Sequence, residues 1–273
     1  EFSVALVDYR QPDGANGEIV NHTTELQIPT IVITPKVSET VRNHLLSSKV
    51  VDYFQKDSVL TFDHIDRILT RLERNPSYTV LVVDDSKTAR INISSLLKRH
   101  KYKVLLAENG NEALKELKLH PEIKIVITDH EMPEMGGIEL VKQIRTKHSK
   151  EELTIIGVSA NGNSTMSARF IKYGANDFIA KPFCDEEFYC RLSQNVDFLE
   201  LVQKEKRNAN TDFMTGLFNR RYLYNEIKKN PHAHFICSSC SSVECINEEM
   251  NVNLPSYKIE NIIIKGICPK CLV

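Results

Sequence analysis

The chain has 273 residues, enough for about two domains and a substantial hydrophobic core. Lysine and arginine total 35 against 36 aspartate and glutamate residues, so a formal net charge of −1 gives no overall attraction to nucleic acid or acidic membranes. The sequence has no apolar run of roughly 18 residues and no signal-peptide pattern, so we expect a cytoplasmic protein without a membrane partner. Because it begins at Glu1, already in a predicted strand, we expect a piece of something longer.

Residues 1–75 alternate between short apolar strands and helices. The predicted strands are 4–7, 28–34 and 50–54, and the predicted helices are 38–48 and 62–74. Residues 78–198 repeat this alternation with strands at 78–83, 103–107, 124–128, 153–158 and 178–180, and helices at 87–99, 111–119, 138–147, 166–173 and 185–200. Five apolar strands separated by helices predict an α/β fold with a doubly wound, five-stranded parallel sheet.

The helix that begins at Asp185 continues as a predicted connecting helix to about residue 210, because its apolar positions keep a helical spacing. A turn and a helix follow, and after Asn230 the composition changes abruptly to cysteine, histidine and serine. We therefore divide the chain into segments 1–75, 78–198, 199–230 and 231–273.

Five side chains of the second segment follow the ends of its predicted strands. They are Asp84, Asp85, Asp129, Ser159 and Lys181. The carboxyl ends of parallel strands meet at one edge of a sheet, so we expect these groups to lie together. Three carboxylates at one place repel one another unless a cation lies among them, and their hard oxygens predict Mg²⁺. The alternative is that the acids are strand-end caps and the lysine a surface charge.

With phosphate oxygens held by the metal, Asp129 can attack phosphorus in line. The Lys181 ammonium and the Ser159 hydroxyl would take up charge on the phosphoryl oxygens. The sequence thus predicts an acyl phosphate on Asp129.

The segments VLVVDDS, VITDHEMPEMGG, GVSA and AKPF, in this order, resemble the signature of response-regulator receiver domains over all of 78–198. The resemblance implies a flavodoxin-like fold and phosphorylation of Asp129 by a histidine kinase or phosphotransfer protein. It also implies Mg²⁺ binding by Asp84, Asp85, Asp129 and the backbone carbonyl of Glu131.

In that family the hydroxyl at Ser159 moves towards the phosphoryl group and the aromatic ring at Phe178 reorients. Glu131 and Asn161 match positions that tune hydrolysis of the phosphoaspartate. The resemblance therefore predicts a switch that acts on an attached output.

An aspartate, a hydroxyl and a lysine recur in the first segment with the spacing of the second. They are Asp8, Thr34 and Lys56, matching Asp129, Ser159 and Lys181. The first copy lacks an acidic pair and begins at what is the third strand of the second copy. We expect residues 1–75 to be a partial receiver that serves as packing surface or homodimer contact, not as a phosphoacceptor.

The segment DFMTGLFNRR at 212–221 resembles the opening of GGDEF diguanylate cyclase domains. The Gly-Gly-Asp/Glu-Glu-Phe turn of that family has no counterpart downstream, so we do not expect this chain to be an enzyme. The alternative is a diguanylate cyclase response regulator whose catalytic part is missing.

The tail carries two CxxC pairs, Cys237 with Cys240 and Cys268 with Cys271, whose thiolates predict a structural Zn²⁺ knuckle; disulfides or free thiols are the alternatives. The strings PHAHFICSSCSSVEC and IIIKGICPKC resemble the dimerisation region of ferric uptake regulator metalloregulators. This resemblance implies a possible second metal, whose ligands are His232, His234 and Glu244.

Two further alternatives remain for the tail. It could act as a metal sensor, or an artificial junction near Asn230 could join pieces of two unrelated proteins. No basic reading helix is visible in the sequence, so we do not expect DNA binding.

Overall fold

The structure of the chain is a computed structural model. It describes residues 3–12, 14, 16–56, 60–160, 164–222, 225, 233–239, 243–246 and 263–267. Two compact units divide the chain, Glu1–Glu200 and Leu201–Val273. Among the described residues, no helix combines the length and the apolar character needed to cross a membrane.

A five-stranded parallel sheet forms the centre of the second segment, as predicted. Its strands, in chain order, are β4 (Thr79–Val83), β5 (Lys103–Ala107), β6 (Ile123–Asp129), β7 (Thr154–Ser159) and β8 (Asp177–Ala180). Their order in space is β5-β4-β6-β7-β8, so the chain winds outward from β4 in both directions. The central strands are buried on both faces, which explains their continuous apolar sequences.

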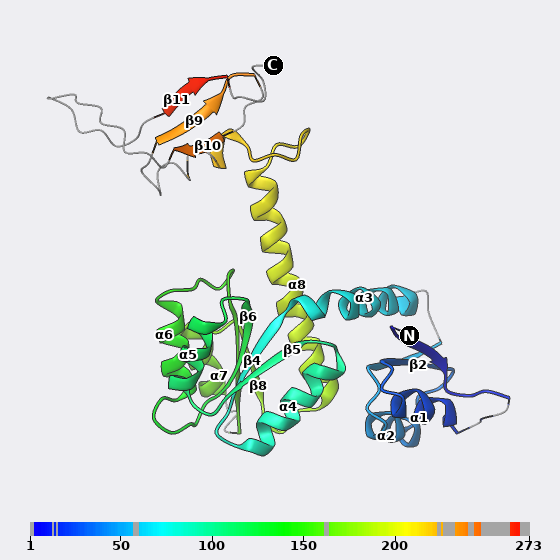
Figure 1. Cartoon of the computed structure of the whole chain (residues 1–273). Helices are drawn as coiled ribbons and strands as arrows, with labels where there is room; N and C mark the ends of the chain where they lie inside the picture. Colours follow the sequence, from blue (N-terminus) through cyan, green and yellow to red (C-terminus); the bar gives the residue numbers. More distant parts are fainter. Residues whose placement is uncertain are drawn as a thin grey trace. The chain divides into compact units, whose positions relative to one another are not determined.

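Five helices cover the two faces of this sheet (Figure 1). They are α4 (Lys87–Arg99), α5 (Gly110–Leu119), α6 (Gly137–Arg145), α7 (Ser164–Lys172) and α8 (Asp185–Asn210). One apolar core joins α4 and α8 to the sheet, with Phe188 fully buried in it. The other joins α5, α6 and α7, with Phe170 at its centre. The sheet is therefore doubly wound, with two helices on one face and three on the other.

The first segment has its own three-stranded parallel sheet in the order β1-β2-β3. Its elements are β1 (Ala5–Asp8), α1 (Glu18–Glu25), β2 (Thr30–Thr34), α2 (Glu39–Ser47), β3 (Asp52–Gln55) and α3 (Leu60–Arg74), followed by the 3₁₀ turn Asn75–Ser77. The predicted bounds of the other elements agree with the structure to within two residues, but α1 was missed. Helix α1 has only eight residues, and it follows Gly17 with no side-chain cap at its start, so the sequence gives no clear signal for where it begins.

The first segment packs on the second through buried and half-buried polar contacts. Arg71 on α3 donates hydrogen bonds of 2.8 and 2.6 Å to the two carboxylate oxygens of Glu200 on α8. Tyr53 and Arg42 each bind Glu186 near the start of the same helix, at 2.9 Å. Helix α8 is thus held by the first segment near both ends of its packed portion.

The second unit contains a three-stranded sheet in its described residues, where the sequence had predicted only a metal knuckle. Its strands are β9 (Ala233–Cys237), β10 (Val243–Ile246) and β11 (Ile263–Gly266), in the order β10-β9-β11. Strand β10 runs antiparallel to β9, and β11 runs parallel to it. Backbone pairing across this sheet therefore contributes to holding the tail together.

A buried histidine lies where the two segments meet, and it should make their stability depend on pH. His100 is 8% exposed, its Nε2 donates to the Val51 carbonyl at 3.2 Å, and its ring stacks on Tyr189. Burial lowers the pKa of His100 to about 3, although the Val51 hydrogen bond acts in the opposite direction. The unfolded chain protonates this ring near pH 6.5, so its contribution is complete above that pH and is lost as pH falls.

We expect the free energy of unfolding to fall between pH 6.5 and 5 by up to about 1.4 kcal/mol per pH unit from this group. His100→Gln, which can still donate to Val51 but cannot titrate, should show a shallower dependence in urea unfolding. Asp52 acts in the opposite sense, because burial raises its pKa to about 6. Its contribution is present in both proteins and cancels in their difference. Equal pH slopes for the two proteins would contradict this prediction.

Candidate functional site

Two acidic side chains and one lysine meet at the carboxyl edge of the five-stranded sheet. The Lys181 Nζ lies 2.6 Å from Asp129 Oδ1 and 2.8 Å from Asp84 Oδ2. Asp84 is 2% exposed and Asp129 is 9% exposed. One ammonium group therefore joins two carboxylates that are almost completely withdrawn from water.

Strand register explains why residues so far apart in sequence meet here. Strand β4 lies between β5 and β6, and Val83 is paired with Thr128, so the following residues Asp84 and Asp129 leave the sheet side by side. Ser159 ends the next strand and pairs with Ala180. The backbone N–H of Lys181 then donates to the Ser159 carbonyl at 2.8 Å, which continues the ladder beyond the last strand.

Backbone groups orient both carboxylates. Asp84 Oδ1 accepts a hydrogen bond of 2.9 Å from the Ser86 N–H, and Asp129 Oδ2 accepts one of 2.8 Å from the Glu131 N–H. The second oxygen of each acid faces Lys181. Each acid is thus held at one oxygen by its own turn and at the other by the shared cation.

The turn after Asp129 requires glycine at position 137. A Cβ atom there would lie 2.0 Å from the Asp129 carbonyl oxygen, far inside van der Waals contact. The Gly137 N–H also donates to the His130 carbonyl at 3.0 Å, so the turn folds back tightly on the strand end. Gly137, the second glycine of the EMPEMGG segment, therefore leaves room for the backbone of Asp129 because it has no side chain.

Lys181 remains positively charged in this setting. Burial lowers the pKa of Lys181, but hydrogen bonds and charge attraction from Asp129 and Asp84 more than offset it, and the net pKa is raised. The ammonium group therefore compensates the charge of the two acidic side chains that it binds.

The donor set was tested against Mg²⁺, which takes hard oxygen ligands and commonly uses only one or two protein carboxylates. Asp84 and Asp129 supply two such carboxylates side by side, and in this structure both bind the Lys181 ammonium. Asp85 is exposed, and within the described residues no three acidic, histidine or cysteine side chains come together as a metal group. The site fits a magnesium ion held by two carboxylates, with further oxygens from a backbone carbonyl, water or a bound phosphate.

The remaining predicted side chains of this segment lie as follows. Ser159 is buried at the end of β7, and Phe178 is buried in β8 with its ring centroid 5.5 Å from that of Phe170. Glu131 is exposed. Asn161 lies outside the described residues.

The metal residues predicted for the tail are described only in part. Cys237 is buried at the end of β9, and the backbones of His234 and Glu244 lie in β9 and β10. The other predicted tail ligands lie outside the described residues; they are His232, Cys240, Cys268 and Cys271.

One buried residue at this edge was missed by the sequence reasoning. Arg90, in the first turns of α4, contacts the backbone of both Asp84 and Asp85. Its signal in the sequence is its position, because a cation near the start of a helix is disfavoured by the helix dipole and needs a specific partner.

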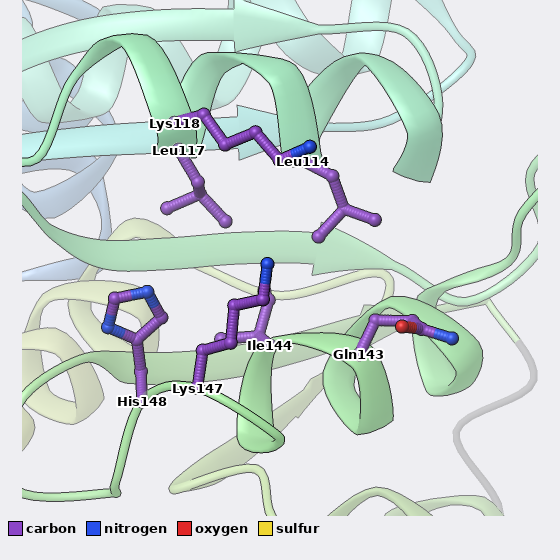
Figure 2. A pocket seen from close by; sticks show the side chains of 7 residues that line it. All are labelled: Leu114, Leu117, Lys118, Gln143, Ile144, Lys147 and His148. Carbon is purple, nitrogen blue, oxygen red and sulfur yellow. The ribbon is translucent and has the colours of Figure 1, made fainter.

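A groove between α5 and α6, with a volume of about 210 Å³, lies away from these residues (Figure 2). Its lining comes from the carboxyl-terminal halves of both helices and the turn after α6, and includes Leu117, Ile144 and His148. A helix that follows a parallel strand runs back along the sheet, so these helix ends lie at the edge where the strands begin. The groove is therefore not part of the Asp129 site.

Comparisons with known proteins agree with this geometry. Residues 80–193 match the family model of the response regulator receiver domain. Chemotaxis protein CheY1 of Helicobacter pylori J99 is 42% identical over 105 residues, covering 38% of this chain and 85% of that protein. Two-component response regulator ORR3 of Oryza sativa subsp. japonica is 36% identical over 113 residues, covering 41% of this chain and 86% of that protein.

A similar solved structure extends beyond the matched domain. A crystal structure described as a two-component system response regulator/GGDEF domain protein has a TM-score of 0.68 and 41% identity. The match covers 73% of this chain and 82% of that one. This chain belongs to the response-regulator receiver family. Receiver domains of this family are Mg²⁺-dependent and act with histidine kinases or phosphotransfer proteins.

Proposed function

We propose that Asp129 accepts a phosphoryl group from the phosphohistidine of a histidine kinase or phosphotransfer protein, and that this switches an attached output. The observation that carries the proposal is the Lys181 ammonium shared by Asp129 and Asp84 at the carboxyl edge of the sheet. A carboxylate held in one orientation beside a fixed cation is suited to attack phosphorus. This chemistry belongs to the cytoplasm, where the phosphodonor would be found.

In the proposed step, a carboxylate oxygen of Asp129 forms a bond to phosphorus as the phosphorus–nitrogen bond of the donor breaks. The electron pair of that bond returns to the imidazole, and an acyl phosphate remains on Asp129. Lys181 stays protonated and moves from carboxylate to phosphoryl oxygen as charge develops there. The Ser159 hydroxyl donates to a second phosphoryl oxygen.

Asp84 and Asp129, with Asp85 and the Glu131 carbonyl, would hold Mg²⁺. When bound, the ion neutralises the phosphoryl oxygens and aligns them for in-line attack. In the phosphorylated state, movement of Ser159 and Phe178 would carry the change to the surface formed by α7 and β8.

We further propose that residues 1–75 form a partial receiver that provides packing surface or a homodimer contact. Lys56 forms an ion pair with Asp8, and its backbone N–H donates to the Thr34 carbonyl at 2.9 Å, as Lys181 does to Ser159. The hydrogen bond from Lys56 lowers the pKa of Asp8. Among its described residues, the segment repeats the lysine–aspartate pair with no cluster of acids that could hold a metal, which favours a structural role.

The full chain, incubated with Mg²⁺ and acetyl phosphate as donor, should acquire one acid-stable, hydroxylamine-sensitive phosphate. Asp129→Asn should reduce the label to background, because an amide oxygen is too weak a nucleophile to form the acyl phosphate. Asp8→Asn is the matched control, since Asp8 also pairs with a lysine, and it should leave the label unchanged. Retention of the label in Asp129→Asn would exclude Asp129 as the acceptor.

A second candidate function is that this receiver belongs to a diguanylate cyclase response regulator. The match to a response regulator/GGDEF domain protein supports it, as does the turn at 212–218. There, Asp212 Oδ1 accepts hydrogen bonds from Thr215 Oγ1 and its N–H at 2.9 and 3.0 Å. Phe213, in the same turn, is 97% exposed.

We expect this chain itself to form no cyclic dinucleotide from GTP and Mg²⁺, because its sequence has no counterpart of the GGDEF turn. Chromatography of the reaction products over many turnovers would test this. Sustained formation of cyclic dinucleotide would show that the chain is an enzyme and not only a switch.

We also propose a Zn²⁺ site formed by Cys237, Cys240, Cys268 and Cys271. Strands β9 and β11 are parallel, with Cys237 paired with Gly266, and the Ser238 N–H donates to the Gly266 carbonyl at 2.7 Å. Cys268 is two residues beyond Gly266 in the sequence. This pairing supports the proposal, because Cys237 lies beside Gly266, which precedes the second CxxC segment by two residues. A second metal at His232, His234 and Glu244, as in a metal sensor, is the weaker extension of it.

Purified chain should contain about one zinc ion, measured by atomic spectrometry, since four thiolates close a tetrahedral site. Cys237→Ser should remove most of this zinc. Cys245→Ser, in the same tail but outside the proposed ligand set, should retain it. Equal zinc content in the Cys237→Ser variant and the unchanged chain would remove Cys237 from the site.

A further inference from the structure

We propose that Arg90 is the positioning residue of the acidic pair, holding the backbone of Asp84 and Asp85 so that their carboxylates can bind Mg²⁺. The inference rests on the proposed function for its meaning, but its evidence is the set of contacts that Arg90 makes. The three acceptors of its guanidinium group come from the loop after β4 and from the end of β5.

One nitrogen of the guanidinium group binds two successive backbone carbonyls. Arg90 Nη1 lies 2.6 Å from the backbone carbonyl oxygen of Asp84 and 3.0 Å from that of Asp85. Fixing two neighbouring carbonyls fixes the peptide planes on both sides of Asp85, and with them the direction in which each Cα–Cβ bond leaves the chain. The contact therefore sets the direction in which both side chains leave the backbone, and it does so through the backbone carbonyls and not through the carboxylates.

The other nitrogen ties this loop to the neighbouring strand. Arg90 Nη2 lies 2.5 Å from Glu108 Oε1, just beyond the end of β5. The Asp84 N–H donates to the carbonyl of Ala107, the residue before Glu108, at 3.2 Å. The guanidinium group thus links α4, the acidic loop and β5 into one unit.

The location of Arg90 argues against a general packing role. Its side chain is 7% exposed and lies four residues after Ser86, the residue that caps α4. A buried cation near the start of a helix is disfavoured both by desolvation and by the helix dipole. The carbonyls and the carboxylate that surround it compensate for this, and its charge in turn reduces the repulsion between the acids.

Lysine cannot replace this arrangement. Lysine has one compact ammonium group in place of the planar guanidinium group with its separate nitrogens. It therefore cannot bind the two carbonyls and, at the same time, the carboxylate on the opposite side of the guanidinium position. Loss of a group that orients metal ligands typically weakens metal binding about 10- to 100-fold. Arg90→Lys keeps the charge and removes the geometry, so it isolates the positioning role.

The test compares Arg90→Lys with Arg99→Lys in the full chain. Arg99 is in the same helix, its side chain is 14% exposed, and it donates to Asp185 at 2.8 Å. The two variants therefore make the same substitution at a buried, ion-paired arginine, and only one of them is beside the acidic pair. Mg²⁺ affinity would be measured by calorimetry on folded protein, and stability by urea unfolding without Mg²⁺.

We expect Arg90→Lys to weaken Mg²⁺ binding about 10- to 100-fold and Arg99→Lys to leave it unchanged, even if both lose stability. Should Arg90→Lys fail to fold, Glu108→Ala replaces it, because the Glu108 side chain is 67% exposed and its loss leaves the core intact. That variant should weaken Mg²⁺ binding in the same direction by a smaller factor.

Wild-type Mg²⁺ affinity in the folded Arg90 variant, or in Glu108→Ala where it stands in, would overturn the inference. So would an equal loss of affinity in Arg99→Lys, because it would show a general effect of destabilisation. Weakened Mg²⁺ binding in Arg90→Lys, together with no phosphate on wild-type Asp129, would support this inference and contradict the proposed function.

Discussion

The ion pair that Lys181 makes with Asp84 and Asp129 is the interaction on which the candidate site depends. Two buried carboxylates at one sheet edge repel one another, and little water is present to screen their charges. The Lys181 ammonium compensates both acids by hydrogen bonding to them at 2.8 and 2.6 Å. It thereby holds the two acidic side chains together at the carboxyl edge of the sheet, where they are almost completely buried.

The same lysine–aspartate pair appears in the first segment, where it has a different setting. Asp8 and Lys56 are partly exposed, and no second carboxylate shares the lysine among the described contacts. A partly exposed ion pair contributes little to stability, because water screens the charges of both groups. The three-stranded sheet therefore preserves the geometry of the pair, but its described residues lack the second carboxylate that shares Lys181 in the larger sheet. The larger contribution of the first segment to stability comes from the hydrogen bonds that Arg71, Tyr53 and Arg42 make to helix α8.

Much of the fold could be predicted because its signals are local. The strands of the five-stranded sheet are continuous apolar runs, and α4 begins at Lys87 after the cap residue Ser86, whose side chain accepts from the Ala89 N–H. Helix α1 was missed because it is short and follows Gly17 without a capping side chain, whereas α2 begins after Ser38, whose side chain accepts from the Val41 N–H. Arg90 was missed for a different reason. Its partners are two backbone carbonyls and a glutamate 18 positions away, and no local pattern reports such contacts.

The order of most strands and helices, the positions of the acids and the lysine at the strand ends, and the receiver motifs could all be recognised from the sequence alone. These depend on short-range periodicity and on residue types, which the printed chain shows directly. Only the tertiary structure decided which side chains meet: that Lys181 is shared by Asp84 and Asp129, that Asp85 stays exposed, and that Arg90 holds the acidic loop. Those facts depend on strand register and on the spatial order β5-β4-β6-β7-β8, because it is the sheet that brings distant residues to one edge.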